Sequence, residues 1–125
     1  MTIDKCRILS FPKIVDTRGD LSFIEESKHV PFDIKRVYYI YGVPKGSTRG
    51  NHLQRVTEQV IIALNGRFTV RLRDACGEKT YVLDKPNCGL YIPQGIWHQI
   101  KDFSPGSIML VLASTFYDEK DYVRD

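Results

Sequence analysis

The chain has 125 residues, of which 42% are hydrophobic and 26% are charged, and its formal net charge is +3. This length predicts one domain, residues 1–125, and the composition excludes intrinsic disorder. The basic residues are scattered among acidic ones, which argues against a nucleic-acid partner, whereas a modest positive excess suits a small anionic ligand.

Targeting and redox signals point to a soluble protein. Residues 1–6 contain no apolar signal region, and the longest apolar run, 108–113, is far shorter than the roughly 20 residues that span a bilayer. Cys6, Cys76 and Cys88 lack metal-ligand spacing, so we expect free thiols in a reducing compartment. We therefore predict a cytoplasmic protein with no membrane partner.

Short β-rich segments alternate with turn signals along the whole chain, which predicts an all-β sandwich or barrel. A strand is expected to carry His52. The other predicted strands are 8–14, 21–25, 34–41, 58–64, 68–73, 80–83, 90–92, 97–101 and 107–114.

Turn-forming residues separate these predicted strands. Residues 16–20 predict a turn between the first two strands, and 74–79 a second connection. Asn65-Gly66 predicts a type I′ hairpin between 60–64 and 68–73, because both central positions of that turn need positive φ. The polar, aromatic tail, residues 116–125, is expected to hold a short helical turn or to dock against a neighbour.

Polar side chains at alternate positions indicate a site. His52, Gln54 and Glu58 share one parity, so in an extended strand they point to one face. A second strand, after Pro93-Gln94-Gly95, could bring His98 to the same cavity. The spacing matches the two-motif signature of metal-binding cupin barrels, with Gln54 where a second histidine would stand. A metal held by His52, Glu58 and His98 is therefore one open alternative.

Arginines and aromatic residues form two further groups. Arg18, Arg36 and Arg49 each lie beside a turn or strand end, and their planar guanidinium groups match the oxygens of a diphosphate. Aromatic rings can stack on a base or a sugar face. Those considered are Tyr38, Tyr39, Tyr91 and Trp97; because Tyr38 and Tyr39 are adjacent, one must face the barrel interior and the other must face outward.

Several segments resemble the dTDP-4-dehydro-6-deoxyglucose 3,4-ketoisomerase family, and the likeness runs from about Arg7 to Arg124. The matching segments are Asp16-Thr17-Arg18-Gly19-Asp20-Leu21, Ile34-Lys35-Arg36-Val37-Tyr38-Tyr39-Ile40, Arg49-Gly50-Asn51-His52, Glu58-Gln59-Val60, Leu64-Asn65-Gly66, Gly89-Leu90-Tyr91, Trp97-His98 and Val111-Leu112-Ala113-Ser114.

The resemblance implies a single cupin barrel (a double-stranded β-helix, or jelly roll), a homodimer, and an isomerase without metal or cofactor. It implies that the enzyme moves a keto group from C4 to C3 of a dTDP-linked 6-deoxyhexose through an enediol(ate), for 3-amino-3,6-dideoxy sugar synthesis. His52 would exchange the proton, and Tyr39 or His98 would donate to the oxyanion. The remaining substrate contacts are expected from Arg18, Arg36, Arg49, Glu58, Tyr91 and Trp97.

One position departs from the family pattern. The family shows Arg-Gly-x-His-x-His, whereas this chain has Gln54 at the last position, and an amide cannot exchange a proton at neutral pH. If Gln54 only orients substrate, it can occupy the catalytic site without loss. The alternative is a dTDP-sugar-binding cupin that is inactive or catalyses another reaction, such as epimerisation.

Overall fold

The structure, a computed structural model, describes residues 2–124 and is built almost entirely of strands. Its elements are η1 (Thr2–Lys5), β1 (Arg7–Ser10), β2 (Lys13–Ile14), β3 (Leu21–Ser22), β4 (Arg36–Tyr41), β5 (Arg49–Gln54), β6 (Gln59–Asn65), β7 (Phe68–Asp74), β8 (Gly77–Leu83), β9 (Cys88–Ile92), β10 (Trp97–Lys101), β11 (Ile108–Ala113), η2 (Glu119–Asp121) and β12 (Tyr122–Arg124). None of the helices in this range could cross a membrane.

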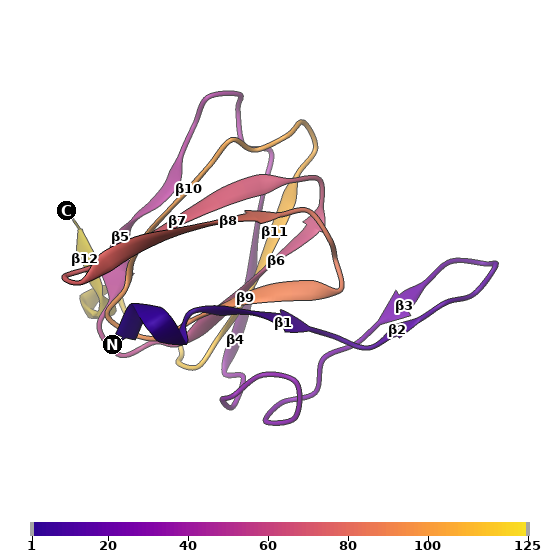
Figure 1. The fold of residues 1–125 in the computed structure, drawn as a ribbon, viewed down its shortest axis with the longest axis horizontal. Helices are drawn as coiled ribbons and strands as arrows, with labels where there is room; N and C mark the ends of the chain where they lie inside the picture. Colours follow the sequence, from indigo (N-terminus) through magenta and orange to yellow (C-terminus); the bar gives the residue numbers. More distant parts are fainter. Residues whose placement is uncertain (1, 125) are drawn as a thin grey trace.

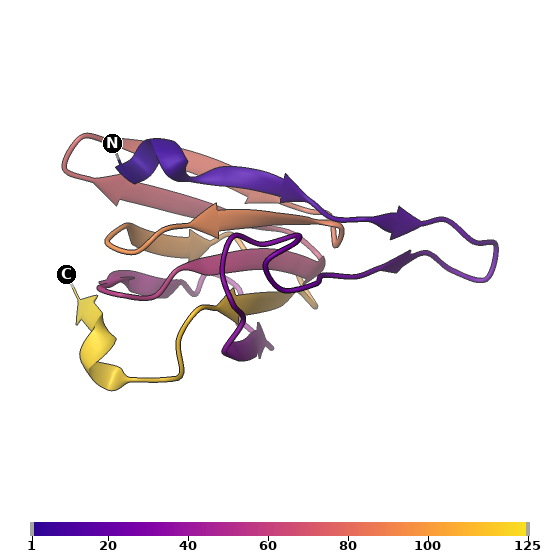
Figure 2. The same ribbon diagram turned by 90° about the horizontal axis from the view of Figure 1, so that it is seen from below.

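Two five-stranded antiparallel sheets face each other (Figures 1 and 2). The first sheet has the order β1-β9-β6-β11-β4, and the second has the order β12-β5-β10-β7-β8. The sequence prediction of an all-β jelly-roll barrel is therefore confirmed. Most predicted strands lie within a few residues of the observed ones, and β10 covers the predicted range.

The Asn65-Gly66 turn has a different role from the predicted one. Strands β6 and β7 pair in different sheets, so the turn is a corner between sheets and not a hairpin. Gly66 has a φ of 76°, but Asn65 is not among the positive-φ residues, as a type I′ turn would require. The Asn65 side-chain amide instead donates to the carbonyl of Gly106 at 2.8 Å, which fixes the corner against the loop before β11.

Apolar side chains fill two clusters on opposite faces of the first sheet. The main cluster lies between the sheets and includes Ile61, Phe68 and Val111. The second cluster lies on the outer face, where Val30 and Phe32 pack over Val60, Ile62 and Leu112. Strand β6 is therefore buried on both faces, and the segment before β4 acts as a cover that keeps its outer face from water.

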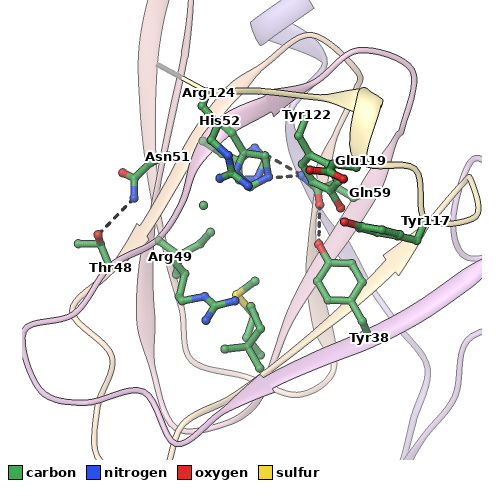
Figure 3. Close-up of a pocket in the computed structure, with 15 residues that line it drawn as sticks. Tyr38, Thr48, Arg49, Asn51, His52, Gln59, Tyr117, Glu119, Tyr122 and Arg124 are labelled. Carbon is green, nitrogen blue, oxygen red and sulfur yellow. Dashed lines mark hydrogen bonds between the residues drawn. The ribbon is translucent and has the colours of Figure 1, made fainter.

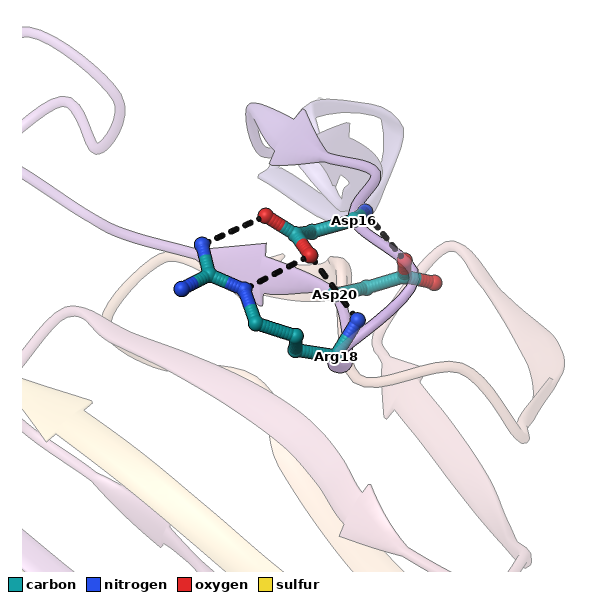
Figure 4. A network of polar contacts seen from close by, with 3 residues as sticks. All are labelled: Asp16, Arg18 and Asp20. Carbon is teal, nitrogen blue, oxygen red and sulfur yellow. Dashed lines mark hydrogen bonds and ion pairs between the residues drawn. The ribbon is translucent and has the colours of Figure 1, made fainter.

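Strands β2 and β3 form a hairpin that extends away from the two sheets (Figures 1 and 2). Ile14 and Leu21, paired across this hairpin, are each 54% exposed. At the tip, Asp16 accepts hydrogen bonds from the backbone and side chain of Arg18 (Figure 4). The hairpin confirms the predicted turn at residues 16–20 and leaves an apolar surface exposed.

The C-terminal segment folds back on the barrel. It contains the short helical turn η2, as the sequence predicted, and then β12, which adds to the edge of the second sheet beside β5. The sequence pattern of residues 122–124 does not predict this strand. The neighbour on which the tail docks is the strand that carries His52.

Replacing Gly66 with alanine tests the corner. The added Cβ would lie 2.6 Å from Ser107 Oγ and 2.7 Å from Ser104 Oγ, whereas at Gly46, with a similar φ of 84°, it meets nothing within 4 Å. Gly46→Ala should cost roughly 1–2 kcal/mol of unfolding free energy from backbone strain alone. Gly66→Ala should cost about 1–3 kcal/mol more from overlap. Urea unfolding measures both, and equal losses would contradict the crowded corner.

Candidate active site

A cavity of about 440 Å³ opens between the two sheets and beneath the C-terminal segment (Figure 3). It is polar and rich in aromatic side chains. Strands β4, β5, β6 and β10 contribute side chains, and so do residues 117–124. The lining residues discussed below are Tyr38, Arg49, His52, Gln59, His98, Tyr117, Glu119, Tyr122 and Arg124.

A bulge in β5 orients the residues of the Arg49–His52 motif. His98 pairs with His52, but Gln99 pairs with Gly50 and Ile100 with Arg49, so Asn51 is an extra residue. Asn51 and Gly50 have φ values of 63° and 82°. The extra residue reverses the alternation, and therefore both Arg49 and His52 line the cavity although they are three positions apart.

Two observations favour glycine at position 50 in this bulge. Its positive φ is costly for other residues, and a Cβ there would lie 3.0 Å from the carbonyl oxygen of His98. The close approach of β5 to β10 brings the rings of His52 and His98 to a centroid distance of 4.9 Å. The sequence expectation that the two histidines reach one cavity agrees with this placement.

The two histidines differ in burial, and so in their chemistry. Burial, aided by the nearby His52, lowers the pKa of His98 to about 4. His98 is therefore neutral near pH 7, with Gln59 Nε2 3.3 Å from its Nε2. Burial also lowers the pKa of the half-buried His52, and Arg124 and Arg49 lower it further. A neutral imidazole that faces the cavity is able to accept a proton.

Gln59, and not Glu58, is the β6 residue at the cavity. Residues 55–58 lie between β5 and β6, outside both strands, so the side-chain alternation that starts at His52 does not continue through them. Glu58 instead accepts a hydrogen bond of 2.6 Å from the hydroxyl of Tyr91, whose ring belongs to the outer-face cluster. The prediction that Glu58 and Tyr91 join the site is therefore wrong for this chain: neither lines the cavity.

This displacement also separates the proposed metal ligands. Glu58 would have to lie beside His52 and His98 to complete a metal site with three ligands, but it is bonded to Tyr91 instead. Within residues 2–124, no group of three histidine, cysteine, aspartate or glutamate side chains is placed to hold a metal ion. The donor set required by the metal-dependent alternative does not assemble.

Side-chain alternation along β4 places the adjacent Tyr38 and Tyr39 on opposite faces of the sheet. Tyr38 faces the cavity, where its hydroxyl lies 3.5 Å from Gln59 Oε1 (Figure 3), and burial raises its pKa to about 12. Tyr39 is 61% exposed, and its ring stacks on Tyr41 on the outer face. The predicted role of Tyr39 as an oxyanion donor is thus corrected: the phenol at the cavity belongs to Tyr38.

The three arginines are not brought together within one chain. Arg49 lines the cavity. Arg36 lies beside it, where it donates a 3.4 Å hydrogen bond to the Tyr122 hydroxyl and covers the ring of Tyr38. Arg18 lies at the hairpin tip, 88% exposed and paired with Asp16, and it does not reach the cavity of its own chain (Figure 4).

Two other predicted site residues lie outside the cavity. Trp97 lies on the outer face of β10, where Arg73 and Arg71 cover its ring at 4.2 and 5.8 Å. Gln54 is 2% exposed and does not line the cavity, and neither atom of its amide has a hydrogen-bond partner within residues 2–124. Trp97 therefore cannot stack on a ligand in this cavity.

One wall of the site is formed by residues that the sequence pattern does not predict. The period-two pattern from His52 favours Glu58 and passes over its neighbour Gln59. The C-terminal side chains Tyr117, Glu119, Tyr122 and Arg124 also line the cavity. The paired tyrosines in a polar tail were the available signal, since aromatic rings in such a tail usually pack against something.

The buried neutral His98 should make the protein less stable in acid. Its pKa is about 4 in the folded protein and 6.5 ordinarily, so between these values only the unfolded chain takes up the proton. Stability should be complete above about pH 6.5 and fall by the order of 3 kcal/mol as the pH falls to about 4. His52, whose pKa is also lowered, acts in the same direction.

Urea unfolding at several pH values between about 4 and 7.5 measures this loss. The variant His98→Gln removes the titrating group and should show a flatter dependence. A parent protein that is as stable at about pH 4.5 as at neutral pH would contradict the buried neutral imidazole.

Comparison with known proteins places this cavity in context. The family model described as FdtA: WxcM-like, C-terminal matches residues 4–125. A TDP-4-oxo-6-deoxy-alpha-D-glucose-3,4-oxoisomerase from Aneurinibacillus thermoaerophilus is 46% identical over 118 residues, which cover 94% of this chain and 85% of that protein.

Solved structures agree. A mutant of the 3,4-ketoisomerase QdtA from Thermoanaerobacterium thermosaccharolyticum, in complex with TDP-4-keto-6-deoxyglucose, is 44% identical with a TM-score of 0.93, covering 96% of this chain and 87% of that chain. The TDP-quinovose 3,4-ketoisomerase WlaRB from Campylobacter jejuni is 42% identical, also with a TM-score of 0.93, covering 97% and 93%. Together with the family match, these likenesses show that the chain belongs to the sugar-nucleotide 3,4-ketoisomerase family of cupin barrels.

Proposed function

We propose that this protein is a 3,4-ketoisomerase that converts dTDP-4-keto-6-deoxyglucose to a dTDP-3-keto-6-deoxyhexose, without a metal, for the synthesis of 3-amino-3,6-dideoxy sugars. One observation carries the proposal. A half-buried imidazole with a lowered pKa, His52, faces a polar cavity in a chain that is 46% identical to a TDP-sugar oxoisomerase.

The chemistry requires one group that takes and returns a proton. The C4 ketone acidifies the neighbouring C3–H bond, and a base removes that proton to give an enediolate with its charge on the C4 oxygen. Return of a proton to C4, with transfer of the hydroxyl proton from O3 to O4, completes the shift. His52 suits the base role because it is neutral near pH 7 and faces the cavity.

Tyr38 suits the role of oxyanion donor. Its raised pKa of about 12 keeps the phenol protonated, so it can donate a hydrogen bond to the developing charge. Gln59 lies between Tyr38 and His98 and accepts or donates through its amide, which orients both side chains toward the same space. The proton donor is therefore reassigned from Tyr39 to Tyr38.

Positive charge at the cavity would hold the diphosphate. Arg49 and Arg124 line the cavity, and the guanidinium of Arg36 lies over the ring of Tyr38 beside it. Guanidinium groups bind phosphate oxygens through two parallel hydrogen bonds. Anchoring the nucleotide in this way would place the sugar against His52, and such positioning lowers reaction barriers by several kcal/mol.

Gln54 is the departure that motivates the second candidate, a dTDP-sugar-binding relative without this activity. Its position argues against that candidate. Gln54 is buried and does not line the cavity, so an amide there removes no acid or base from the surface that would meet the sugar. We expect Gln54→His to change turnover by less than about tenfold.

Three further expectations belong to this proposal. The exposed apolar hairpin of β2 and β3 suits association with a second copy, and the expected assembly is a homodimer. Arg18, at the tip of that hairpin, could contact substrate only in the cavity of another chain. The expected location remains the cytoplasm.

A proton NMR time course with dTDP-4-keto-6-deoxyglucose in D₂O tests the function. We expect the 3-keto product to appear with deuterium at C4, because His52 exchanges its proton with solvent. His52→Asn should lower kcat by at least about a hundredfold while dTDP binding is retained. Binding without conversion by the parent protein would favour the second candidate, and unchanged turnover in His52→Asn would refute the role of His52.

The two adjacent tyrosines provide a matched pair. Tyr38→Phe removes the phenol at the cavity and should lower kcat by about a hundredfold with a smaller effect on KM. Tyr39→Phe removes the same atom from the outer face, where the side chain is 61% exposed, and should leave kcat unchanged. Steady-state kinetics measure both, and a larger loss from Tyr39→Phe would restore the sequence-based assignment.

A further inference from the structure

We propose that Asp121 is a positioning residue: it fastens residues 116–124 over the cavity and thereby sets the packing of Tyr122 against His52. The effect on turnover rests on the proposed function. The placement of Tyr122 does not, because it can be measured on the protein without substrate.

Asp121 is the buried anchor of an otherwise exposed segment. It is 5% exposed, whereas the residues from 116 to 120 are exposed. Its carboxylate accepts hydrogen bonds from the backbone N–H of Val56, at 2.7 Å, and from the hydroxyl of Thr57. The N–H of Arg55 donates to its carbonyl oxygen at 2.9 Å. A buried carboxylate is costly unless it is bonded in this way, so these contacts define one position for the segment.

Outside this anchor, the segment also contacts Arg36, which donates to the Tyr122 hydroxyl at 3.4 Å and lies 5.6 Å from the centre of the Tyr117 ring. Strand β12 has three residues, lies at the edge of the second sheet and, within residues 2–124, pairs with β5 alone. Strands this short are weakly held by their ladder alone. The anchor lies immediately before β12, so it restrains Tyr122 directly and Arg124 through the strand.

What the anchor places is the cover of His52. The ring of Tyr122 lies 4.8 Å from the ring of His52, and Arg124 pairs with His52 in the sheet (Figure 3). Figure 3 shows Tyr122 and Arg124 on the side of His52 away from Arg49. Release of the segment would uncover the imidazole and remove a neighbouring positive charge.

The direction of the resulting pKa change separates three explanations. The titratable and charged groups around His52 are His98 from β10, Arg49 from β5, Asp121 from η2, Tyr122 and Arg124 from β12, with Tyr38, Tyr117 and Glu119 across the cavity. Burial is the main cause that lowers the pKa of His52, followed among charges by Arg124, while Asp121 raises it slightly. Loss of the anchor should therefore raise this pKa. Loss of the Asp121 charge alone would lower it, and a purely stabilising role would leave it unchanged in folded protein.

The test is an NMR titration of the His52 imidazole in the full chain, assigned by its absence in His52→Asn. In Asp121→Asn, the His52 imidazole should titrate at higher pH than in the parent protein. Thr57→Val removes the hydroxyl donor at nearly constant volume and should also raise the pKa of the His52 imidazole. Thr57→Ser retains the donor, so its His52 imidazole should titrate as in the parent protein. If Asp121→Asn does not fold, the Thr57 pair decides alone.

Kinetics give an independent readout. In the variants that lose the anchor, kcat should fall by about tenfold, and the acid limb of kcat/KM should move to higher pH with the pKa of His52. An unchanged or lowered His52 pKa in folded Asp121→Asn or Thr57→Val overturns the proposal. A parent protein without ketoisomerase activity would refute the proposed function and leave the titration result valid.

Discussion

The bulged pairing of β5 with β10 is the interaction on which the candidate site depends. One extra residue, Asn51, reverses the side-chain alternation, so that Arg49 and His52 face the same cavity. The bulge has two consecutive residues with positive φ, and a Cβ at position 50 would lie only 3.0 Å from the carbonyl oxygen of His98. Without the bulge, the guanidinium of Arg49 would point to the outer face while the imidazole of His52 stayed inside.

Burial then sets the protonation states of the two histidines and of Tyr38 at the site. Full burial keeps His98 neutral, while the half-buried His52 retains access to the cavity. Gln59, inside the barrel, contacts both His98 and Tyr38, so the proposed acid–base residue, His52, lies beside side chains that are held by hydrogen bonds. A neutral base, a protonated phenol and nearby guanidinium groups are what proton transfer beside a carbonyl requires.

The first sheet divides the molecule into two environments. Its inner face belongs to the barrel and the cavity, whereas its outer face is partly covered by residues before β4 and holds Tyr91 and Glu58. Side chains only one residue apart therefore have unrelated roles, as Glu58 and Gln59 show. The C-terminal segment adds a wall that no strand of the barrel supplies, and its buried carboxylate joins that wall to the loop after β5.

Local patterns in the sequence determined the strand content, the hairpin turn at residues 16–20 and the prediction that His52 and His98 reach one cavity. They could do so because period-two patterns and turn residues act over a few positions. Motif segments also identified the family. Tertiary structure alone decided which of Tyr38 and Tyr39 faces inward, that Gln59 replaces Glu58, that Asn65-Gly66 joins two sheets, and that Arg18 and Trp97 lie outside the cavity. The physical reason is that facing depends on register, bulges and sheet partners, which long-range pairing sets and which a local pattern cannot contain.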